Sequence, residues 1–337
     1  MKTIMRQPHS PASSSLVSIV LLAHNGKRYI HDCARSVVNQ RYRNFEIIVV
    51  DNGSTDGSVQ ALKAMFPSWI YVEHKDNLGF SAGMNSGLEI AQGDYVVPLN
   101  QDVYLAEDFV GKCLDIMAAR PGVGALGANE YKWTDGKLTD ELQSPGPALF
   151  LRLRIKGVFM KINTPIAPAF GVNGSFPFLR KETLIELKRR DGHIYDPAFF
   201  SGWEDQDLWW RMQLRGWECY ATQEIKAWHA GASFAEEKQS FISKPARYQR
   251  WVMRNRWLVI LKNLPLHLLL ILSPLLLLFE MALPFYLLIR SPRALPAWIG
   301  GWKEIVGSLP DILKKRRIIQ QSRVIPLKHI IRWFRGI

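Results

Sequence analysis

The sequence predicts an α/β protein with a mostly parallel sheet and helices on both faces of that sheet. From Val17 onward, short runs rich in β-branched residues alternate with stretches of helical periodicity. These runs are apolar throughout, which is typical of strands that are buried on both sides of a parallel sheet. Polar residues gather directly after the runs, and ligands of open α/β sheets bind beyond the carboxyl ends of the strands. We therefore expect a binding site at that edge.

The expected elements follow one another regularly in the first part of the chain. The expected strands are SIVLLAH, FEIIVVD, IYVEH and DYVVPLN, and the expected helices cover 29–40, a segment starting near Ser58, 81–92 and 107–119. Residues 131–168 have no clear period, so loops or a strand of a second half are expected there. Patterning returns in AFGVNGSFPFLRKETLIEL and in FFSGWEDQDLWW, whose acids fall in the first turn of a helix.

Charge is distributed unevenly along the chain. Residues 243–337 carry 17 basic and three acidic groups, whereas residues 1–242 carry 26 basic and 27 acidic groups. The basic part also contains the longest apolar stretch, a combination that favours an anionic membrane surface over nucleic acid as its partner. We expect a flexible tail at 1–15, a catalytic domain at 16–242 with halves at about 16–130 and 131–242, and a membrane-associated helical region at 243–337.

The apolar stretch at 265–289 is long enough to cross about 30 Å of hydrocarbon at about 1.5 Å per residue. Pro274, Glu280 and Pro284 interrupt it, and both of its flanks are basic, against the positive-inside tendency. We favour a re-entrant or in-plane element, with a true span as the alternative. Leu327, Ile330, Ile331 and Phe334 have the spacing of an interfacial amphipathic helix, with packing on the catalytic domain as the alternative.

The N-terminus and the cysteines indicate the compartment. The apolar run LVSIVLLA follows Lys2 and Arg6 like a short signal peptide, but no cleavage pattern follows it, and it fits a first strand better. The three cysteines are far apart and form no CxxC pair, which favours a reducing compartment.

Three expected strands end in polar clusters, namely DNGSTDG, the group His74, Asp76 and Asn77, and NQD. Turns and helix caps use the same residue types, so each cluster alone has an ordinary structural explanation. Their convergence on one edge favours a ligand site. The chain has neither a GxxxxGK[ST] loop nor GxGxxG after its first strand.

The ordered motifs SIVLLAHN, IIVVDNGSTDGS, NLGFSAGMNSGLEIAQGDYVVPLNQD and FFSGWEDQDLWWRMQLRGW...AWHAGAS resemble those of the family 2 glycosyltransferases. The resemblance covers roughly 17–234 and is strongest to the rhamnosyltransferase-like branch of bacterial surface-polysaccharide enzymes. It implies a GT-A fold and inverting transfer of a sugar, rhamnose being one candidate, from a nucleotide diphosphate sugar to a lipid-linked or polysaccharide acceptor. The setting that it implies is the cytoplasmic face of the inner membrane.

A departing nucleoside diphosphate builds up negative charge, which Mg²⁺ or Mn²⁺ stabilises as a Lewis acid with only one or two protein carboxylates. The family holds this ion with a DxD motif, and Asn100-Gln101-Asp102 aligns with it. The first acid is replaced by Asn100, so Asp102 is the expected carboxylate ligand. The resemblance also implies that His229 contacts the metal or the diphosphate, whereas a lone histidine is more often structural.

The resemblance further assigns a set of donor-binding residues. Asp51 matches the acid that reads the nucleobase, although capping the next turn is its ordinary role. The expected donor-binding residues are Asn25, Asp51, Ser54, Asn77, Gly79, Asn85, Asn100 and Asp102.

Inverting displacement needs a base that accepts the acceptor hydroxyl proton on the face opposite the leaving group. Asp205 aligns with the family's catalytic acid pair and is the expected base, with Glu204 positioning the acceptor. Acids in a first helical turn are also favoured by the helix dipole. Asp207 and Arg211 form an ordinary i, i+4 pair, so Asp207 is expected to be structural.

Other functions remain open from the sequence. A nucleotidyltransferase shares the nucleotide-binding edge but needs neither the Glu-Asp helix nor the membrane region. A catalytically inactive binding subunit is conceivable because the metal motif has lost its first acid. Nucleic-acid binding is the weakest alternative, since the basic residues of the last quarter alternate with aliphatic runs. The oligomeric state is not readable from the sequence.

Overall fold

The computed structural model describes residues 14–134, 136–144, 147–149, 158–159, 164–231 and 245–333. The tail expected at 1–15 lies outside this part of the chain except for Ser14 and Ser15. The Tyr42 hydroxyl donates a hydrogen bond to the Ser15 carbonyl, and Asn44 donates one to the Ser14 carbonyl. The chain is therefore held to the connection around residues 42–44 before the first strand begins.

The described strands form a ten-stranded mixed sheet whose main path runs β10-β13-β6-β12-β4-β1-β2-β3. The strands β1 (Val17–Ala23), β2 (Phe45–Asn52), β3 (Ile70–His74) and β4 (Tyr95–Asn100) are mutually parallel, as predicted. The remaining strands of this sheet are β5 (Val103–Leu105), β6 (Val123–Thr134), β7 (Lys137–Ser144), β10 (Ile166–Ala169), β12 (Phe178–Arg180) and β13 (Glu218–His229). A smaller sheet contains β8 (Pro147–Leu149), β9 (Val158–Phe159) and β11 (Gly171–Val172).

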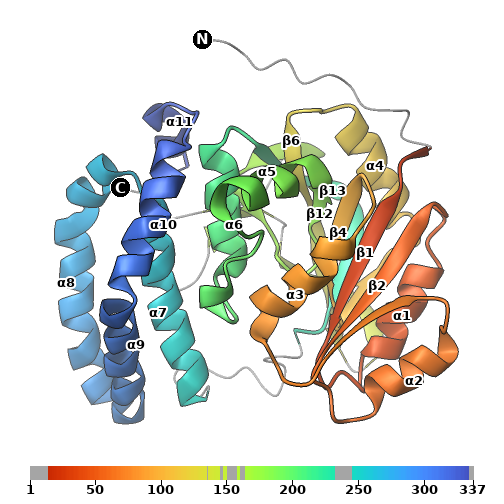
Figure 1. The fold of residues 1–337 in the computed structure, drawn as a ribbon, viewed down its shortest axis with the longest axis horizontal. Coiled ribbons are helices and arrows are strands. Elements are labelled where there is room, and N and C mark those ends of the chain that lie inside the picture. The colour runs from red at the N-terminus through yellow and green to blue at the C-terminus, as the bar shows by residue number, and fades with distance from the viewer. Residues whose placement is uncertain are drawn as a thin grey trace.

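Helices cover both faces of the main sheet, because successive strand residues point to opposite sides. Val20 of β1 lies in one core with Met84 of α3, whereas Ile19 and Leu21 lie in the other core with Cys33 of α1 (Figure 1). The helices of this part are α1 (Ile30–Val38), α2 (Ser58–Met65), α3 (Gly79–Ile90), α4 (Phe109–Ala118), α5 (Lys181–Asp191) and α6 (Glu204–Leu214). The bounds of α1, α3 and α4 and the start of α2 lie within about two residues of the sequence expectations.

Residues 245–333 contain the α-helices α7 (Ala246–Asn263), α8 (Leu266–Arg290), α9 (Leu295–Gly307), α10 (Leu309–Gln321) and α11 (Leu327–Ile331) and the short 3-10 helix η4 (Pro292–Ala294). They stack beside α6, on the side of the molecule away from α1 and α2, with α8 outermost (Figure 1). Trp257 and Leu258 of α7 share one core with Leu208 and Trp209 of α6. The C-terminal helices thus continue the core of the preceding α/β part.

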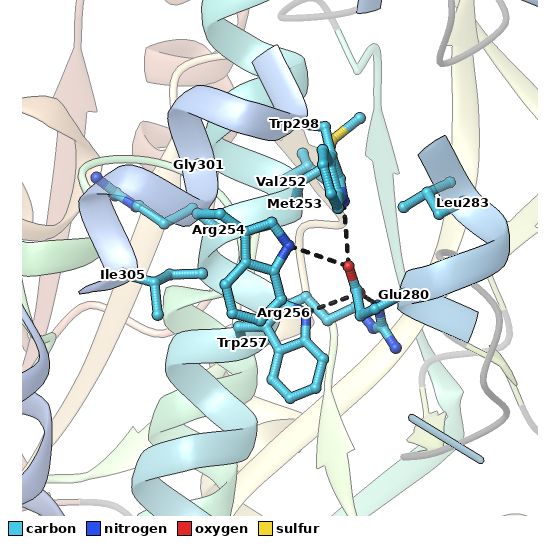
Figure 2. A pocket seen from close by; sticks show the side chains of 11 residues that line it. Val252, Met253, Arg254, Arg256, Trp257, Glu280, Leu283, Trp298, Gly301 and Ile305 are labelled. Carbon is cyan, nitrogen blue, oxygen red and sulfur yellow. Dashed lines mark hydrogen bonds and ion pairs between the residues drawn. The ribbon is translucent and has the colours of Figure 1, made fainter. Parts of the chain in front are cut away.

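Helix α8 runs unbroken through Pro274 and Pro284, and within the described part of the chain it is the one helix long and apolar enough to cross a membrane. Glu280 lies in the middle of its buried side. The Glu280 carboxylate accepts hydrogen bonds from Arg256 and Trp257 of α7 and from Trp298 and Trp302 of α9 (Figure 2). A buried acid needs such partners, so this network fixes which side of α8 faces the protein.

The amphipathic segment near the C-terminus packs against the rest of the protein. Ile330 is buried and belongs to the core shared with α6, and Trp333 contacts the ring of Phe170. Phe334 lies outside the described residues. The alternative of packing on the catalytic domain, rather than an interfacial helix, therefore describes the segment around α11.

Candidate functional site

The four parallel strands end together, as the sequence predicts. Ala23 pairs with Asp51, Asn52 pairs with His74, and Leu22 pairs with Asn100 across neighbouring strands. Since parallel strands share a direction, the polar residues that follow β1 to β4 gather at one edge of the sheet.

Asn25, Asp51 and Ser54 form a locally bonded turn. The Asp51 carboxylate accepts a hydrogen bond from Ser54 N at 2.8 Å, and Asn25 N donates to Ser54 Oγ at 3.1 Å. Asn25 Oδ1 accepts from Thr55 N at 2.8 Å, which joins the turn after β1 to the turn after β2. Asn25 itself has a φ of 49°, a conformation that asparagine tolerates better than most residues. The turn-capping role expected for Asp51 is present.

Asn77 and Gly79 close the next turn. Asn77 Oδ1 accepts hydrogen bonds from Gly79 N at 2.8 Å and from Asn52 Nδ2 at 3.1 Å. Gly79 has a φ of 81°, and a Cβ at this position would lie 2.6 Å from the Phe200 carbonyl oxygen, so this position requires glycine. Asn85 joins α3 to a distant segment, because its amide exchanges hydrogen bonds with the backbone N–H and carbonyl of Tyr195.

The three residues of the NQD motif have different contacts. Gln101 is used in the fold: its side-chain oxygen accepts from His24 N and its amide donates to the His24 carbonyl, both at 2.9 Å. The backbone N–H of Asn100 donates to the Ser175 carbonyl at 2.9 Å. Asp102 is buried, and its carboxylate faces His229.

His229 lies between two carboxylates. Its Nε2 atom is 3.3 Å from Asp102 Oδ1, and its Nδ1 atom is 3.0 Å from Glu130 Oε1. Strand β5 doubles back after Asp102 and pairs with β13, which places His229 opposite Val103, while β6 brings Glu130 alongside. Burial opposes the charged imidazolium, but the two carboxylates outweigh it and raise the pKa of His229 to about 10. Glu130 has a lowered pKa, because its bonds to His229 outweigh the effect of its burial.

This arrangement fits a divalent ion. Neighbouring ligands of an octahedral Mg²⁺ with bonds of about 2.1 Å lie about 3 Å apart, close to the separation of the Asp102 and His229 atoms. Metal-ligating histidines usually donate their second ring N–H to a carboxylate that fixes the ring, and Glu130 occupies that position at Nδ1. Asp102 and His229 would therefore be a suitable pair of ligands, with Glu130 as the supporting acid, in a complex where the ion replaces the proton on His229 Nε2.

Residues 173–175 connect this pair to the acids of α6. Asn173 Nδ2 donates to Glu130 Oε2 at 3.1 Å, and Ser175 Oγ lies 3.4 Å from His229 Nδ1. Between them, Gly174 approaches α6 so closely that a Cβ would lie 2.9 Å from Asp205 Oδ2. The structure therefore brings His229 and Asp205 to one short segment, with Asp102 joined to it through His229, although these residues are far apart in the sequence.

Glu204 and Asp205 begin α6 and are poorly solvated. Desolvation raises the pKa of Asp205 to about 6, and desolvation together with the Asp205 charge raises the pKa of Glu204 to about 8. The Glu204 Oε2 atom is buried without a hydrogen-bond partner among the described residues. Two adjacent carboxyls that titrate at different pH are suited to proton transfer near neutrality.

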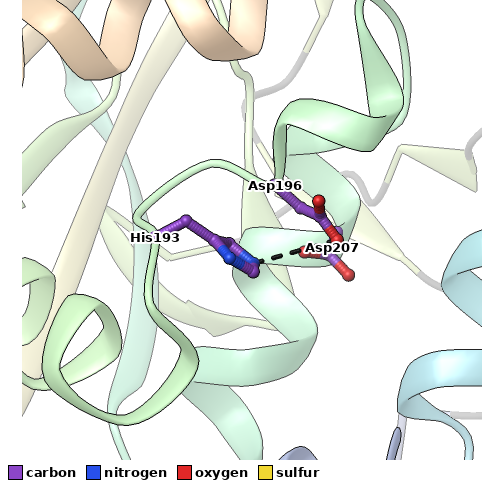
Figure 3. A group of neighbouring side chains, drawn as sticks. All are labelled: His193, Asp196 and Asp207. Carbon is purple, nitrogen blue, oxygen red and sulfur yellow. Dashed lines mark ion pairs between the residues drawn. The ribbon is translucent and has the colours of Figure 1, made fainter. Parts of the chain in front are cut away.

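A second acidic group contains His193, Asp196 and Asp207 (Figure 3). Lys262 contacts Asp196 and lies 2.9 Å from Asp207, Lys315 lies 3.0 Å from Asp196, and Arg211 lies 2.8 Å from Asp207. These cations already balance both carboxylates. We therefore interpret the group as a buried salt-bridge cluster that fastens α6 to α7 and α10, in line with the structural role expected for Asp207.

The three tryptophans at the start of α6 and within it differ in their burial. Trp209 and Trp210 are buried in the core, as tryptophans at helical spacing usually are. Trp203 is only partly buried and immediately precedes Glu204.

The mixed sheet, in which β1 to β4 are parallel as predicted while β5, β7, β10 and β12 pair antiparallel with their neighbours, its carboxylate-bearing edge and the acids of α6 define a GT-A type α/β protein. Residues 18–187 match the model of glycosyl transferase family 2, and the chain belongs to this family. The match ends before Asp205 and His229, so the assignment of these two residues rests on the geometry described above and on the motif resemblance.

Three known proteins illustrate the relationship. An uncharacterized glycosyltransferase of Haemophilus influenzae is 36% identical over 105 residues, covering 30% of this chain and 42% of that protein, so the chain spans less than half of that relative. The Escherichia coli UDP-Glc:alpha-D-GlcNAc-diphosphoundecaprenol beta-1,3-glucosyltransferase WfaP is 30% identical over 169 residues, covering 50% of this chain and 66% of that protein. The solved structure of GalNAc-T7 with UDP, GalNAc and Mn2+ shares the fold, with a TM-score of 0.54 and 13% identity over 73% of this chain and 47% of that chain.

Sequence reasoning missed Glu130, Asn173 and Ser175. Glu130 lies within a long strand in a region whose second half seemed irregular, and its register against β13 is set only by the folded sheet. A signal did exist, because NE in GALGANEY places two polar residues at the end of an apolar run, as DN and NQD do in the earlier strands.

Proposed function

We propose that the chain is an inverting glycosyltransferase that moves a sugar from a nucleotide diphosphate sugar to a lipid-linked or polysaccharide acceptor. The observation that carries this proposal is the position of residues 173–175, which contact Glu130 and His229 on one side and Asp205 on the other. A group that binds the leaving diphosphate and a group that accepts a proton are thereby held at one site, as a single displacement requires.

The donor would bind at the edge formed by β1, β2 and β4, with Asp51 and Asn25 near the base and Asp102 near the diphosphate. Asp102 and His229 would hold Mg²⁺ or Mn²⁺, which supplies Lewis-acid stabilisation of the diphosphate charge when bound. Glu130 keeps the His229 ring oriented through Nδ1. The GalNAc-T7 structure with UDP and Mn2+ supports this choice of ligand class.

Asp205 would act as the base. As the acceptor hydroxyl oxygen bonds to the anomeric carbon, the bond from that carbon to the diphosphate oxygen breaks with its electron pair, and the hydroxyl proton passes to Asp205. Glu204, largely protonated at neutral pH because of its raised pKa, would donate a hydrogen bond to the acceptor. The pair would thus divide the roles of proton acceptor and hydrogen-bond donor.

The finer assignments follow the same division of the chain. We propose that residues 16–130 bind the nucleotide sugar, residues 131–242 bind the acceptor, and residues 243–337 bring the enzyme to the membrane. WfaP acts on a diphosphoundecaprenol acceptor, which supports a lipid-linked substrate. Rhamnose, suggested by the motif resemblance, is a candidate donor sugar to be compared with glucose and galactose derivatives.

We further propose that α8 lies in the plane of an anionic membrane surface, on the cytoplasmic face where nucleotide sugars are available. Its outer side is apolar and exposed, with Leu278 and Phe285 exposed by 63% and 68%. Its inner side packs over most of its length, from Leu268 to Leu287. A spanning α8 would carry the charged helix α7 into hydrocarbon, and that is costly.

Nucleoside diphosphate release tests the proposed activity. Detergent-solubilised protein should release the nucleoside diphosphate from one member of a panel of uridine, thymidine and guanosine diphosphate sugars, including thymidine diphosphate rhamnose. Release should need Mg²⁺ or Mn²⁺ and should fall in a chelator and in Asp102→Ala. Failure both to bind and to cleave every donor, with and without a polyprenyl-linked glycan acceptor, would contradict the proposal.

Vesicle flotation tests the proposed membrane contact. Leu278→Glu with Phe285→Glu should abolish binding to vesicles that contain phosphatidylglycerol. Ile185→Glu is the matched control, because Ile185 is an exposed apolar residue on α5, away from α8. Equal binding of all three proteins would show that α8 is not the contact surface, and resistance of the wild type to alkaline extraction would indicate a true span.

A further inference from the structure

The loop that leads into α6 has an unusual backbone. Phe200 and Trp203 have φ values of 58° and 71°, and Gly202 between them has 85°. Large side chains rarely adopt this left-handed region, and such strain persists only where the surrounding structure holds it. The loop ends at Glu204, so its conformation sets the direction in which Glu204 and Asp205 leave the backbone.

One side chain of α7 holds this loop. Asn255 is fully buried, and its Nδ2 atom donates to the carbonyl oxygens of Phe199 at 2.8 Å, Ser201 at 3.1 Å and Gly202 at 2.7 Å. Converging carbonyls repel one another unless a donor lies between them, and the amide of Asn255 fills that place.

The neighbouring Arg254 fixes the orientation of this amide. Its Nε atom donates to Asn255 Oδ1 at 2.9 Å, which leaves Nδ2 facing the loop. The same guanidinium donates to the carbonyl of Ala198 at 2.7 Å and pairs with Glu304 of α9 at 2.7 Å. Helices α7 and α9 thus form a rigid support behind the loop.

The opposite side of the loop meets the donor edge. The Phe200 carbonyl accepts from Ser81 N at 3.3 Å, and the missing side chain of Gly79 makes room for Phe200. The loop is therefore enclosed between α3, at the proposed nucleotide-sugar side, and α7, in the C-terminal region. Movement of α7 would alter the start of α6 before it altered the sheet.

We propose that Asn255 is a positioning residue for the transfer reaction, holding residues 199–203 so that Asp205 meets residues 173–175. This inference rests on the proposed function and assigns the C-terminal helices a task in catalysis that is separate from membrane contact. Asn255 is fully buried behind the loop and would act through the loop carbonyls that it holds.

The test compares Asn255→Leu with Asn263→Leu. Both are buried asparagines of α7, but Asn263 donates to Asp207 and Val259 instead of the loop. For Asn255→Leu, kcat should fall about 10- to 100-fold with donor KM changed less than about threefold, and the amides of 199–206 should exchange hydrogen faster. Asn263→Leu should lower the melting temperature without this loss of kcat or faster exchange.

A milder variant covers the case in which Asn255→Leu fails to fold. Arg254→Gln keeps the Asn255 side chain but removes the guanidinium bonds to Asn255 Oδ1, Glu304 and the carbonyls of Ala198 and Phe199. It should change kcat and loop exchange in the same direction to a smaller extent. Unchanged exchange at 199–206, or an equal kcat loss in Asn263→Leu, would overturn the positioning role. An inactive wild type would instead refute the proposed function, because exchange is measured without substrate.

Discussion

The two sides of the site use their polar groups differently. On the β1 to β3 edge, Asn25, Ser54 and Asn77 are bonded to backbone N–H groups or to each other within short turns. On the β13 and α6 side, Glu130, His229, Glu204 and Asp205 are poorly solvated and have shifted pKa values.

The turn residues give the site its shape, and the desolvated residues give it its reactivity. Satisfied turn groups give a rigid edge of defined form, which suits recognition of a donor. Burial disfavours the charged form of a carboxyl, and binding of a proton or a cation removes that cost. Such carboxyls are suited to catalysis. We therefore expect substitutions on the α6 side to affect turnover most and substitutions on the β1 to β3 edge to affect mainly stability.

The strongest test of this contrast is Asp205→Asn. The amide is nearly isosteric but accepts no proton at neutral pH, so kcat should fall by about 10²- to 10⁴-fold. Donor affinity, measured by calorimetry with a non-transferable donor, should change less than about threefold. Near-normal turnover would remove Asp205 as the base.

Glu130→Gln should have the next largest effect. Loss of the carboxylate behind His229 Nδ1 should lower the affinity for Mn²⁺ by about 10- to 100-fold, as measured by the metal dependence of donor binding. Glu141→Gln is the control, because Glu141 is an exposed acid on the adjacent β7 that forms an ion pair with Lys132. Equal effects of the two variants would argue against a supporting role for Glu130.

The pH dependence sharpens the contrast between the two acids. Because the pKa of Asp205 is raised to about 6, kcat/KM should fall about tenfold per unit as pH drops below that value. Glu204 is already protonated at that pH, because its pKa is raised to about 8. Glu204→Gln should therefore lower the maximal kcat/KM but leave the fall of kcat/KM below pH 6 unchanged. A fall in kcat/KM that begins only near pH 4, in the wild type and in Glu204→Gln, would show that Asp205 is solvated in the working enzyme.

Asn77→Ala should have the smallest effect on activity. It removes two accepted hydrogen bonds in the turn before α3 and should lower the free energy of unfolding by about 1–2 kcal/mol, measured by urea denaturation. kcat/KM should change less than about threefold. A large rise in donor KM at unchanged stability would instead place Asn77 directly on the sugar.

The sequence by itself determined the first half of the fold. Period-two and period-3.6 patterns are local, so β1 to β4 and the helices between them were predictable to within a few residues. The strand-end rule then indicated the edge that carries Asp51 and Asp102. The acidic start of α6 was also visible as a local pattern, but the choice of Asp205 as the base came from the family resemblance, because the helix dipole alone favours acids at such a position.

Only the tertiary structure decided which partners the site residues contact. His229 meets Glu130 across 99 residues of chain, through the register of β13 on β6, and no local pattern encodes that register. The basic surplus of 243–337 likewise suggested a membrane surface, yet Lys262 and Lys315 neutralise Asp196 inside the protein. Such pairings depend on which surfaces are buried against each other, so a charge count along the chain reports their presence but not their partners.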